Sequence, residues 1–513
     1  MKTPVMESME MIRLIQINKK DNTAIAAETA AKGTVLENNL TALDDIPQGH
    51  KISLCALKKG EAVIRYGAVI GYLKNDLEAG ALISEEMLEL PSPPSLEDMP
   101  WGTDINYLLP SSPRKTFLGY DIPGSKYAGI RNILGIMPMV HCASGVLNVA
   151  IEKMKTELLP KFPNVDNIVL LNHIYGCGVA IKARESYMHI RSLKNLMKNP
   201  NFGGEIMAVA LGCEKLTPDM LLDENEINNE NLVILQECKG FRSMIDALMS
   251  MAEKKLSRLN TRVRTELPLS KLCVGMQCGG SDSFSGVSAN PAAGFASDLL
   301  VNAGATVMFS EVTEVRDGIH FLAARCVDER TARKLADEMR WFDNYLDSGG
   351  VDRDANPTPG NKKGGLSNIV EKALGSIAKS GSAPLVEVLS SGERPSKSGL
   401  IFAATPASDI VCGPQQAASG IVLQVFMTGR GTPYGLAPVP VIKVSSRTVM
   451  KDMWDDLIDI NAGTIAEGRE TIEEAGKRLY DMILDTASGI YEPWAERYGL
   501  VNDMAIFNPA PIT

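Results

Sequence analysis

The chain lacks the features of several common protein classes. Only 5% of its 513 residues are aromatic, and no apolar run approaches the roughly 18 residues that a membrane-spanning helix needs. The first 20 residues contain no basic stretch followed by an apolar one, so we find no secretory signal. We therefore expect a cytoplasmic chain that does not cross a membrane.

An excess of positive charge is also missing. Lys and Arg number 52 against 62 Asp and Glu, which gives a net charge of −10 at pH 7. Nucleic-acid binding needs clustered Lys and Arg to neutralise phosphates, so we expect no nucleic-acid partner. A small anionic substrate needs only a few local cations and is compatible with this charge.

The usual cofactor and nucleophile motifs are absent too. The chain has no GxxxxGK(S/T) sequence, and no GxGxxG opens a helix with an acidic residue about 20 positions later, which disfavours a nucleotide-dependent enzyme. GxSxG and HExxH are missing as well. Nine cysteines in a chain without a secretory signal are expected to be thiols, ligands or core residues rather than disulfides.

Composition divides the chain into regions. Residues 1–90 contain short β-rich runs broken by turn clusters, which predicts a small, mostly β domain. Residues 91–116 are rich in Pro and Ser, as in an extended linker. We place a second domain at 117–229 and a last one at 230–513, divided after the acidic, Asn-rich stretch Asp223–Asn231.

From about Phe117 onward, apolar runs of strand length alternate with helical segments, such as the helix expected over Val146–Leu158. Continuous apolar strands indicate sheets covered on both faces, and alternation with helices indicates parallel βαβ units. The sequence thus predicts an α/β fold with mostly parallel sheets. The expected strands are Ile133–Val140, Asn167–Asn172, Glu205–Leu211, Leu232–Leu235, Leu272–Met276, Thr306–Ser310, Leu385–Leu389, Ile401–Ala404 and Val422–Met427.

Chemically versatile residues follow several of these strands, at the edge where parallel sheets bind ligands. Four of the nine cysteines and two of the five histidines lie there, beside glycines that permit tight turns. Thiolates, imidazoles and carboxylates that meet at one edge would suit iron or zinc. The alternative for each cysteine is core packing as a small hydrophobic residue. The residues concerned are His141, Cys142, His173, Cys177, Cys213, Cys278, Glu311 and Glu314.

Two glycine-rich segments suggest binding of an anion. Gln277–Gly294, which includes Ser281 and Asp282, follows a strand and is small and polar, so its backbone N–H groups could face a carboxylate or phosphate. A long loop with a helix cap is the alternative. Arg430 lies in the second such turn and suits a carboxylate through its bidentate fork. The pair Lys362 and Lys363 could add cations from a flexible loop, or could simply form a solvated turn.

Long motifs in the chain closely resemble the galactarate and altronate dehydratase family. They are IPQGHK, RYGAVIGY, NHIYGCGVAI, FGGEIMAVALGCEKL, MQCGGSDSFSGVSANPA, FSEVTEVRD, NPTPGNKKGGLSNIVEKALGSIAKSG and TGRGTPYG, and the resemblance runs from about Leu14 to the terminal FNPAPIT. It implies an N-terminal SAF-type β-clip domain, a second domain and a C-terminal Rossmann-like domain. It also implies a hydro-lyase that converts galactarate to 5-dehydro-4-deoxy-D-glucarate, with ferrous iron as cofactor.

The resemblance and the residues together suggest roles. We expect Cys142, Cys177, Cys278 and Glu311 to bind the metal as a single Fe²⁺ ion, with an iron–sulfur cluster on three cysteines as the alternative. The iron would act as a Lewis acid on the sugar diacid.

The remaining expected roles are acid–base catalysis and substrate binding. Candidate acids and bases are His50, His173 and Asp282, with His50 reaching across from the β-clip domain. Arg430, Lys362 and Ser281 would bind substrate.

The sequence is also compatible with two other functions. The substrate could instead be altronate or another sugar acid, or the chain could be a non-catalytic sugar-acid sensor. A homodimer is the general expectation for a cytosolic enzyme.

Overall fold

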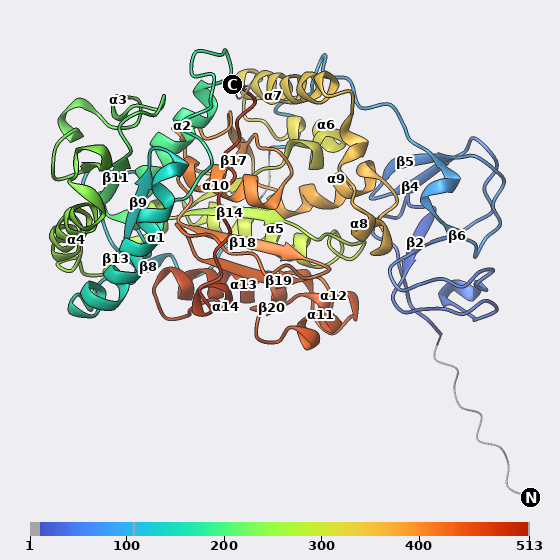
Figure 1. The fold of residues 1–513 in the computed structure, drawn as a ribbon. Helices are drawn as coiled ribbons and strands as arrows, with labels where there is room; N and C mark the ends of the chain where they lie inside the picture. The colour runs from blue at the N-terminus through green and yellow to red at the C-terminus, as the bar shows by residue number, and fades with distance from the viewer. Residues whose placement is uncertain (1–10, 106–107, 511–513) are drawn as a thin grey trace, which may run out of the picture.

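The computed structural model describes residues 11–105 and 108–510. Three parts follow one another along the chain, and Figure 1 shows the N-terminal part (blue) projecting from one side of the larger remainder. The second part (cyan to green) lies on the opposite side, with the C-terminal part between them.

The N-terminal part is built from two small antiparallel sheets, in the orders β1-β2-β3-β6 and β4-β5-β7. Its short apolar runs are separated by tight turns; at Gly80, for example, φ is +88° and a Cβ atom would lie 2.1 Å from the carbonyl oxygen of Thr41. Residues 11–90 contain no α-helix, so the predicted small β domain is confirmed. The strands are β1 (Leu14–Ile15), β2 (Thr23–Ala26), β3 (Lys51–Ser53), β4 (Ala62–Arg65), β5 (Ala68–Leu73), β6 (Leu82–Ile83) and β7 (Leu88–Glu89).

The described residues of the predicted linker form no helix, but they are fastened to the C-terminal part; residues 106 and 107 lie outside the described range. Arg316 donates to the carbonyl oxygen of Pro94 at 2.9 Å, and the N–H of Gly102 donates to the carbonyl of Cys326 at 3.0 Å. Leu96 and Met99 pack against the main core. The segment is therefore an extended strap rather than a free tether.

The second part is a parallel sheet in the order β10-β9-β11-β12. On β9, Leu134 and Ile136 face a core formed with α1 and α4, while Ile133 and Met137 face a core shared with the C-terminal part. Both faces are covered, which explains the continuous apolar strands. The sheet continues past residue 229, because β12 pairs with β11; the domain boundaries themselves stay predictions. The strands are β9 (Ile133–Pro138), β10 (Asn167–Leu170), β11 (Ile206–Ala210) and β12 (Leu232–Ile234).

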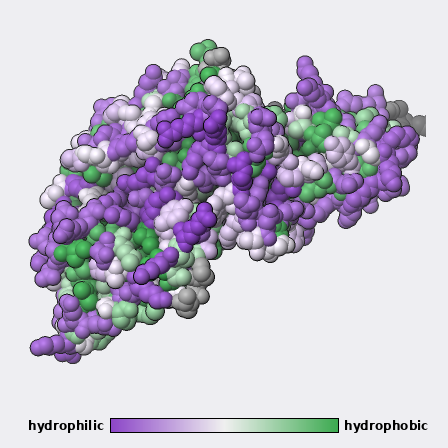
Figure 2. Space-filling model, turned by 90° about the horizontal axis from the view of Figure 1, so that it is seen from above, coloured by the Kyte–Doolittle hydropathy of each residue, from purple (hydrophilic) through white to green (hydrophobic). Residues whose placement is uncertain are grey.

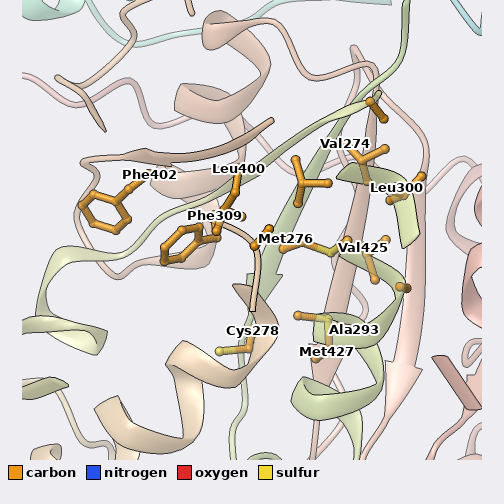
Figure 3. Packing of buried hydrophobic residues seen from close by; sticks show 14 of the residues in the cluster. Val274, Met276, Cys278, Ala293, Leu300, Phe309, Leu400, Phe402, Val425 and Met427 are labelled. Atoms are coloured by element: carbon orange, nitrogen blue, oxygen red, sulfur yellow. The ribbon is translucent and has the colours of Figure 1, made fainter. Parts of the chain in front are cut away.

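The C-terminal part is a seven-stranded parallel sheet in the order β16-β17-β15-β14-β18-β19-β20. Val274, Met276 and Cys278, every second residue of β14, point to one face and pack with Ala293 and Leu300 of α5 (Figure 3). The strands are β14 (Cys273–Cys278), β15 (Thr306–Phe309), β16 (Leu385–Leu389), β17 (Leu400–Ala403), β18 (Leu423–Thr428), β19 (Val441–Ser445) and β20 (Ile460–Asn461); a separate antiparallel pair is β8 (Thr116–Gly119) and β13 (Thr265–Pro268).

All nine expected strands and the α/β fold with mostly parallel sheets are confirmed. The α-helices are α1 (Ser144–Lys153), α2 (Tyr187–Met197), α3 (Pro218–Leu221), α4 (Gly240–Leu259), α5 (Ala289–Asn302), α6 (Ile319–Ala324), α7 (Glu329–Ser348), α8 (Pro359–Lys363), α9 (Ile369–Ile377), α10 (Asp409–Ser419), α11 (Thr448–Met453), α12 (Gly463–Ala466), α13 (Ile472–Ala487) and α14 (Trp494–Arg497). None of the helices in the described ranges has the length and apolar character needed to span a membrane. Figure 2 shows hydrophobic residues in small groups among hydrophilic ones over the face seen from above.

Candidate functional site

The four expected metal ligands do not form one site. The sequence interpretation treated all strand ends as a single edge, but the strands belong to two sheets. Cys142 and Cys177 follow β9 and β10 and are exposed, whereas Cys278 ends β14 and is buried. In the described ranges, Cys278 groups with Glu311 and Glu314, whose possible ligand atoms lie within 4.8 Å of one another.

The buried group is a network of charges at the ends of β14 and β15. The Glu314 carboxylate lies 3.4 Å from the Cys278 Sγ atom and 2.8 Å from the Nζ of Lys372. The Nζ of Lys379 lies 2.7 Å from Glu311 Oε2 and 3.2 Å from Cys278 Sγ. Glu311 also adopts a left-handed backbone with φ +81°, which is unusual outside glycine and often marks a functional position.

Burial is the main cause of the pKa shifts in this network. Burial raises the pKa of Cys278 to about 12, so its thiol is neutral at pH 7. Burial and the nearby Glu314 charge raise the pKa of Glu311 to about 8. For Glu314 burial acts in the same upward direction, but the ammonium groups of Lys372 and Lys379 outweigh it and lower the pKa.

A second group of residues surrounds two consecutive glycines after β14. A Cβ atom on Gly279 would lie 2.3 Å from Asp409 Oδ1, and one on Gly280 would lie 3.7 Å from the Cβ of Arg430. A side chain at position 279 would collide with Asp409, while Gly280 has φ +60°, which favours glycine, and is in ordinary contact with Arg430. Both side chains follow strands of the same sheet, β17 and β18.

Arg430, which the sequence predicts to bind substrate, lies exposed beside this turn. It is exposed, its backbone N–H donates to Gly280 at 3.0 Å, and its guanidinium forms no ion pair with the residues that the structure describes. Asp409 was missed by the sequence interpretation, although its position after a predicted strand could have signalled it. Burial raises the pKa of Asp409 to about 6, which suits proton transfer near neutral pH.

The β-clip domain supplies His50 to the same loop. A Cβ atom on the neighbouring Gly49 would lie 2.6 Å from Ser283 Oγ and 2.9 Å from the ring of Phe284. His50 is half-buried, and burial lowers its pKa. The backbone next to His50 therefore lies against the C-terminal part, whereas its Nδ1 atom lies 3.5 Å from the carbonyl oxygen of Gln48 in its own domain, and its catalytic role stays a prediction.

Other predicted residues have structural partners. Asp282 is 1% exposed, and its carboxylate lies 2.9 Å from the Nε of Arg447 and accepts a hydrogen bond from Ser446, so it helps to hold the loop, and its acid–base role stays a prediction. Ser281 is buried beside it, and its carbonyl accepts a hydrogen bond from Asn361. Lys362 lies in α8, not in a flexible loop, and pairs with Glu85.

His173 is buried in the second part and lies outside both groups. Its Nε2 atom donates to the carbonyl of Pro138 at 2.7 Å, while Nδ1 accepts from the backbone N–H of Tyr175. Burial lowers its pKa to about 4. Both ring nitrogens are therefore occupied by backbone partners, and the expected catalytic role of His173 stays a prediction.

Comparison with known proteins identifies the family. The SAF domain of altronate/galactarate dehydratase matches residues 12–91, the second domain of D-galactarate dehydratase/altronate hydrolase matches 119–260, and the C-terminal domain of D-galactarate/altronate dehydratase matches 269–512. Galactarate dehydratase (L-threo-forming) of Escherichia coli strain K12 is 53% identical over 510 residues, which cover 97% of each chain. The chain belongs to the galactarate/altronate dehydratase family.

The family includes relatives with different named activities. Altronate dehydratase of Bacillus subtilis strain 168 is 31% identical over 93% of this chain and 96% of its own. The (2R)-sulfolactate sulfo-lyase subunit beta of Chromohalobacter salexigens is 30% identical over 73% of this chain and 93% of its own. The predicted SAF domain and hydro-lyase class are thereby confirmed.

Proposed function

We propose that this dehydratase removes water from galactarate and forms 5-dehydro-4-deoxy-D-glucarate. The observation that carries the proposal is the 53% identity to galactarate dehydratase along 97% of both chains. The site around Gly279 and Gly280 supports it, because an exposed Arg430 and a titratable Asp409 face one turn.

The reaction needs acid–base groups and a carboxylate clamp but no redox cofactor. A base removes the proton on the carbon next to one carboxylate, and the hydroxyl on the following carbon leaves as water. The resulting enol takes up a proton and becomes the keto acid. One water is lost per substrate and no electrons are transferred to another molecule.

The residues of the candidate site divide these tasks. Arg430 binds the carboxylate remote from the reacting carbons through two parallel hydrogen bonds. Asp409 is largely ionised at pH 7, because its pKa is about 6, and takes the proton. His50, held at the domain interface, protonates the leaving hydroxyl.

Iron stays a prediction, and the buried Cys278 group does not fit it as it stands. When bound, ferrous iron would polarise a substrate carboxylate as a Lewis acid. Lys372 and Lys379 already neutralise both carboxylates of the group at 2.8 and 2.7 Å. A divalent cation there would meet two ammonium groups, so no step is assigned to a metal at Cys278.

The proposal is tested with a panel of hexarates and hexonates, including galactarate and altronate, assayed under reducing conditions with ferrous iron. We expect 2-keto-acid product from galactarate, with kcat/KM for the other substrates lower by at least about 100-fold. Turnover of altronate in preference to galactarate would refute the assignment.

Two arginine variants test whether Arg430 binds the substrate carboxylate. Arg430→Ala should reduce kcat/KM for galactarate by about 10- to 100-fold, largely through KM, because a charged hydrogen-bond pair is lost. Arg333→Ala is the matched control, since Arg333 is an exposed arginine on α7. Unchanged kinetics in Arg430→Ala would remove Arg430 from the site.

A further inference from the structure

We infer that Arg447 binds the same substrate carboxylate as Arg430 and thereby gives the chain a preference for sugar diacids over sugar monoacids. Galactarate has a carboxylate at each end of its carbon chain, whereas a hexonate such as altronate has one. An enzyme that favours the diacid needs a binding group that a hexonate cannot use. The inference rests on the proposed function, in which Arg430 binds the carboxylate remote from the reacting carbons.

The two arginines occupy equivalent positions after neighbouring strands. β18 and β19 are parallel, and their last residues, Thr428 and Ser445, lie opposite each other in the register. Arg430 and Arg447 each lie two residues beyond this pair. Neighbouring strands are about 4.8 Å apart, and ligands of parallel sheets bind at this edge. The chain therefore brings two arginines to adjacent positions at the edge where a ligand is expected.

Hydrogen bonds join the two turns that carry these arginines. The backbone N–H of Ser446 donates to the carbonyl of Thr428 at 3.0 Å, and Nη2 of Arg447 donates to the carbonyl of Gly429 at 3.2 Å. The Gly429 carbonyl belongs to the peptide bond that leads into Arg430, so the guanidinium of Arg447 lies against the turn that carries Arg430. A carboxylate beside this turn can therefore contact both side chains.

Asp282 holds one side of the Arg447 guanidinium. Its Oδ1 atom accepts hydrogen bonds from the N–H groups of Phe284 and Ser285 at 3.1 and 2.9 Å. The hydroxyls of Ser285 and Ser446 donate to the same atom at 3.0 and 2.9 Å. The Oδ2 atom lies 2.9 Å from Nε of Arg447. A buried carboxylate fixed by four hydrogen bonds gives the guanidinium a rigid support.

The other side of the Arg447 guanidinium is open to a ligand. Within the described ranges, Nη1 of Arg447 has no hydrogen-bond partner, and 21% of the side chain is exposed. Among the carboxylates that the structure describes, only that of Asp282 forms an ion pair with either arginine. One guanidinium charge is thus left without a paired carboxylate. Open donors and an unpaired positive charge fit the carboxylate of a ligand.

The contact between Arg447 and Asp282 could also be a purely structural ion pair, which leads to a different expectation. Loss of a structural pair disturbs the turn and lowers activity toward every acid to the same extent. Loss of a carboxylate-binding group weakens only those acids that bear the second carboxylate. Two acids that differ only in this group therefore separate the explanations.

The test compares galactarate with galactonate, in which a hydroxymethyl group replaces one carboxylate. The full-length chain is assayed for 2-keto-acid product under reducing conditions with ferrous iron, for hours at high enzyme concentration so that slow turnover is measured. Arg447→Gln should lower kcat/KM for galactarate by about 10- to 100-fold, mainly through KM, because a charged hydrogen bond is lost. For galactonate kcat/KM should change by less than about threefold, because this acid lacks the group that Arg447 binds.

Three further variants control for charge, surface position and support. Arg447→Lys keeps the charge but loses the fork, so the loss for galactarate should be smaller, about 3- to 10-fold. Arg469→Gln changes an exposed arginine that pairs with Glu467, and both acids should react as in the natural chain. Asp282→Asn removes the support of Arg447 and should raise KM for galactarate while kcat changes little. Melting temperature and circular dichroism check that each variant folds.

Equal losses for galactarate and galactonate in Arg447→Gln would overturn the inference, as would unchanged kinetics with galactarate. If galactonate gives no product with either chain, the kinetics of galactarate decide: a higher KM at unchanged kcat supports the inference, and a lower kcat at unchanged KM overturns it. A fall of kcat for both acids in Asp282→Asn would overturn its role as the support of Arg447. A natural chain that leaves galactarate unchanged, or prefers altronate, overturns the proposed function instead.

Discussion

At the scale of single residues, Asp409 combines a titratable carboxyl group with a position against the Gly279 turn. Burial raises its pKa from 3.8 to about 6, so the folded state binds its proton more tightly than the unfolded state does. Folding stability contributed by this group therefore falls as pH rises from about 4 to 6, and the loss persists above that range. The ionised carboxylate of Asp409 therefore destabilises the folded state.

Asp409→Asn should consequently change activity and stability in opposite directions. We expect galactarate turnover to fall by at least about 100-fold, and the free energy of unfolding at pH 7.5 to rise by about 1–3 kcal/mol. The stability gain should disappear below pH 4, where the aspartic acid is protonated in both states. Unfolding in urea at several pH values measures it, with Asp246→Asn on exposed α4 as control; a loss of stability at pH 7.5 would contradict the assigned pKa.

Residue types were predictable from the sequence, but their grouping was not. The sequence placed Cys142, Cys177, Cys213 and Cys278 correctly after strands, because thiols beside glycines at strand ends form a local pattern. Which cysteines meet depends on which strands are neighbours, and that order is set by packing between distant segments. Asp409 escaped notice because its environment, rather than its local sequence, alters its pKa.

At the scale of elements, the strands with continuous apolar sequence were all identified, whereas β19 and β20 were not. β19 contains Lys443 and Ser445, which interrupt the apolar pattern although both are fully buried in the structure. β20 has only two residues. Short or polar strands owe their conformation to the neighbouring strand, so single-sequence patterns cannot specify them.

Gly176 connects the loops of the four-stranded sheet, and its replacement tests their coupling. An alanine at position 176 would have to keep φ at +114°, and its Cβ atom would lie 2.1 Å from the carbonyl oxygen of Met139. A backbone oxygen cannot move aside as the end of a flexible side chain could. We expect a loss of about 1–3 kcal/mol in the free energy of unfolding, measured in urea. Gly60→Ala is the control, because Gly60 has φ +83° but no neighbouring atom within 4 Å. Equal effects of the two variants would show that the contact at Gly176 is unimportant.

At the scale of the whole molecule, a buried ionic network joins the β-clip domain to the C-terminal part. The Glu371 carboxylate on α9 lies 2.8 Å from the Nζ of Lys51 and 2.9 Å from the Nε of Arg65, and all three side chains are at most 1% exposed. Lys51 also donates to the carbonyl of Gly365 at 2.6 Å. Because Lys51 follows His50, this network fixes the histidine at the interface.

Nothing in the local sequence identifies this pairing, since its members are more than 300 residues apart along the chain. The apolar contact around it is equally non-local: Val63, Ile70 and Leu73 of the β-clip domain pack with Ile369 and Val370 of α9. The sequence predicted a separate domain and a long linker. It could not predict that buried ion pairs hold this domain against the C-terminal part, where removing one partner would leave an unpaired buried charge.

Glu371→Gln should therefore weaken the attachment of the β-clip domain. Removing the carboxylate leaves Lys51 and Arg65 buried without a counter-ion, for which we expect a loss of about 3–5 kcal/mol in unfolding free energy. Glu28→Gln, at an exposed position of the same domain, should have an effect below about 0.5 kcal/mol.

The stabilisation by Glu371 should also depend on pH. Burial raises the pKa of Glu371, but Lys51 and Arg65 outweigh burial and lower it. The contribution of Glu371 to folding stability is therefore present above about pH 4.5 and is lost as pH falls through the lowered pKa of the folded state. Limited proteolysis should cut the strap around residues 91–105 faster in Glu371→Gln than in the natural chain at pH 7, and the galactarate rate should fall because His50 is no longer held. Unchanged proteolysis together with unchanged urea unfolding would show that the apolar contact with α9 alone keeps the domain in place.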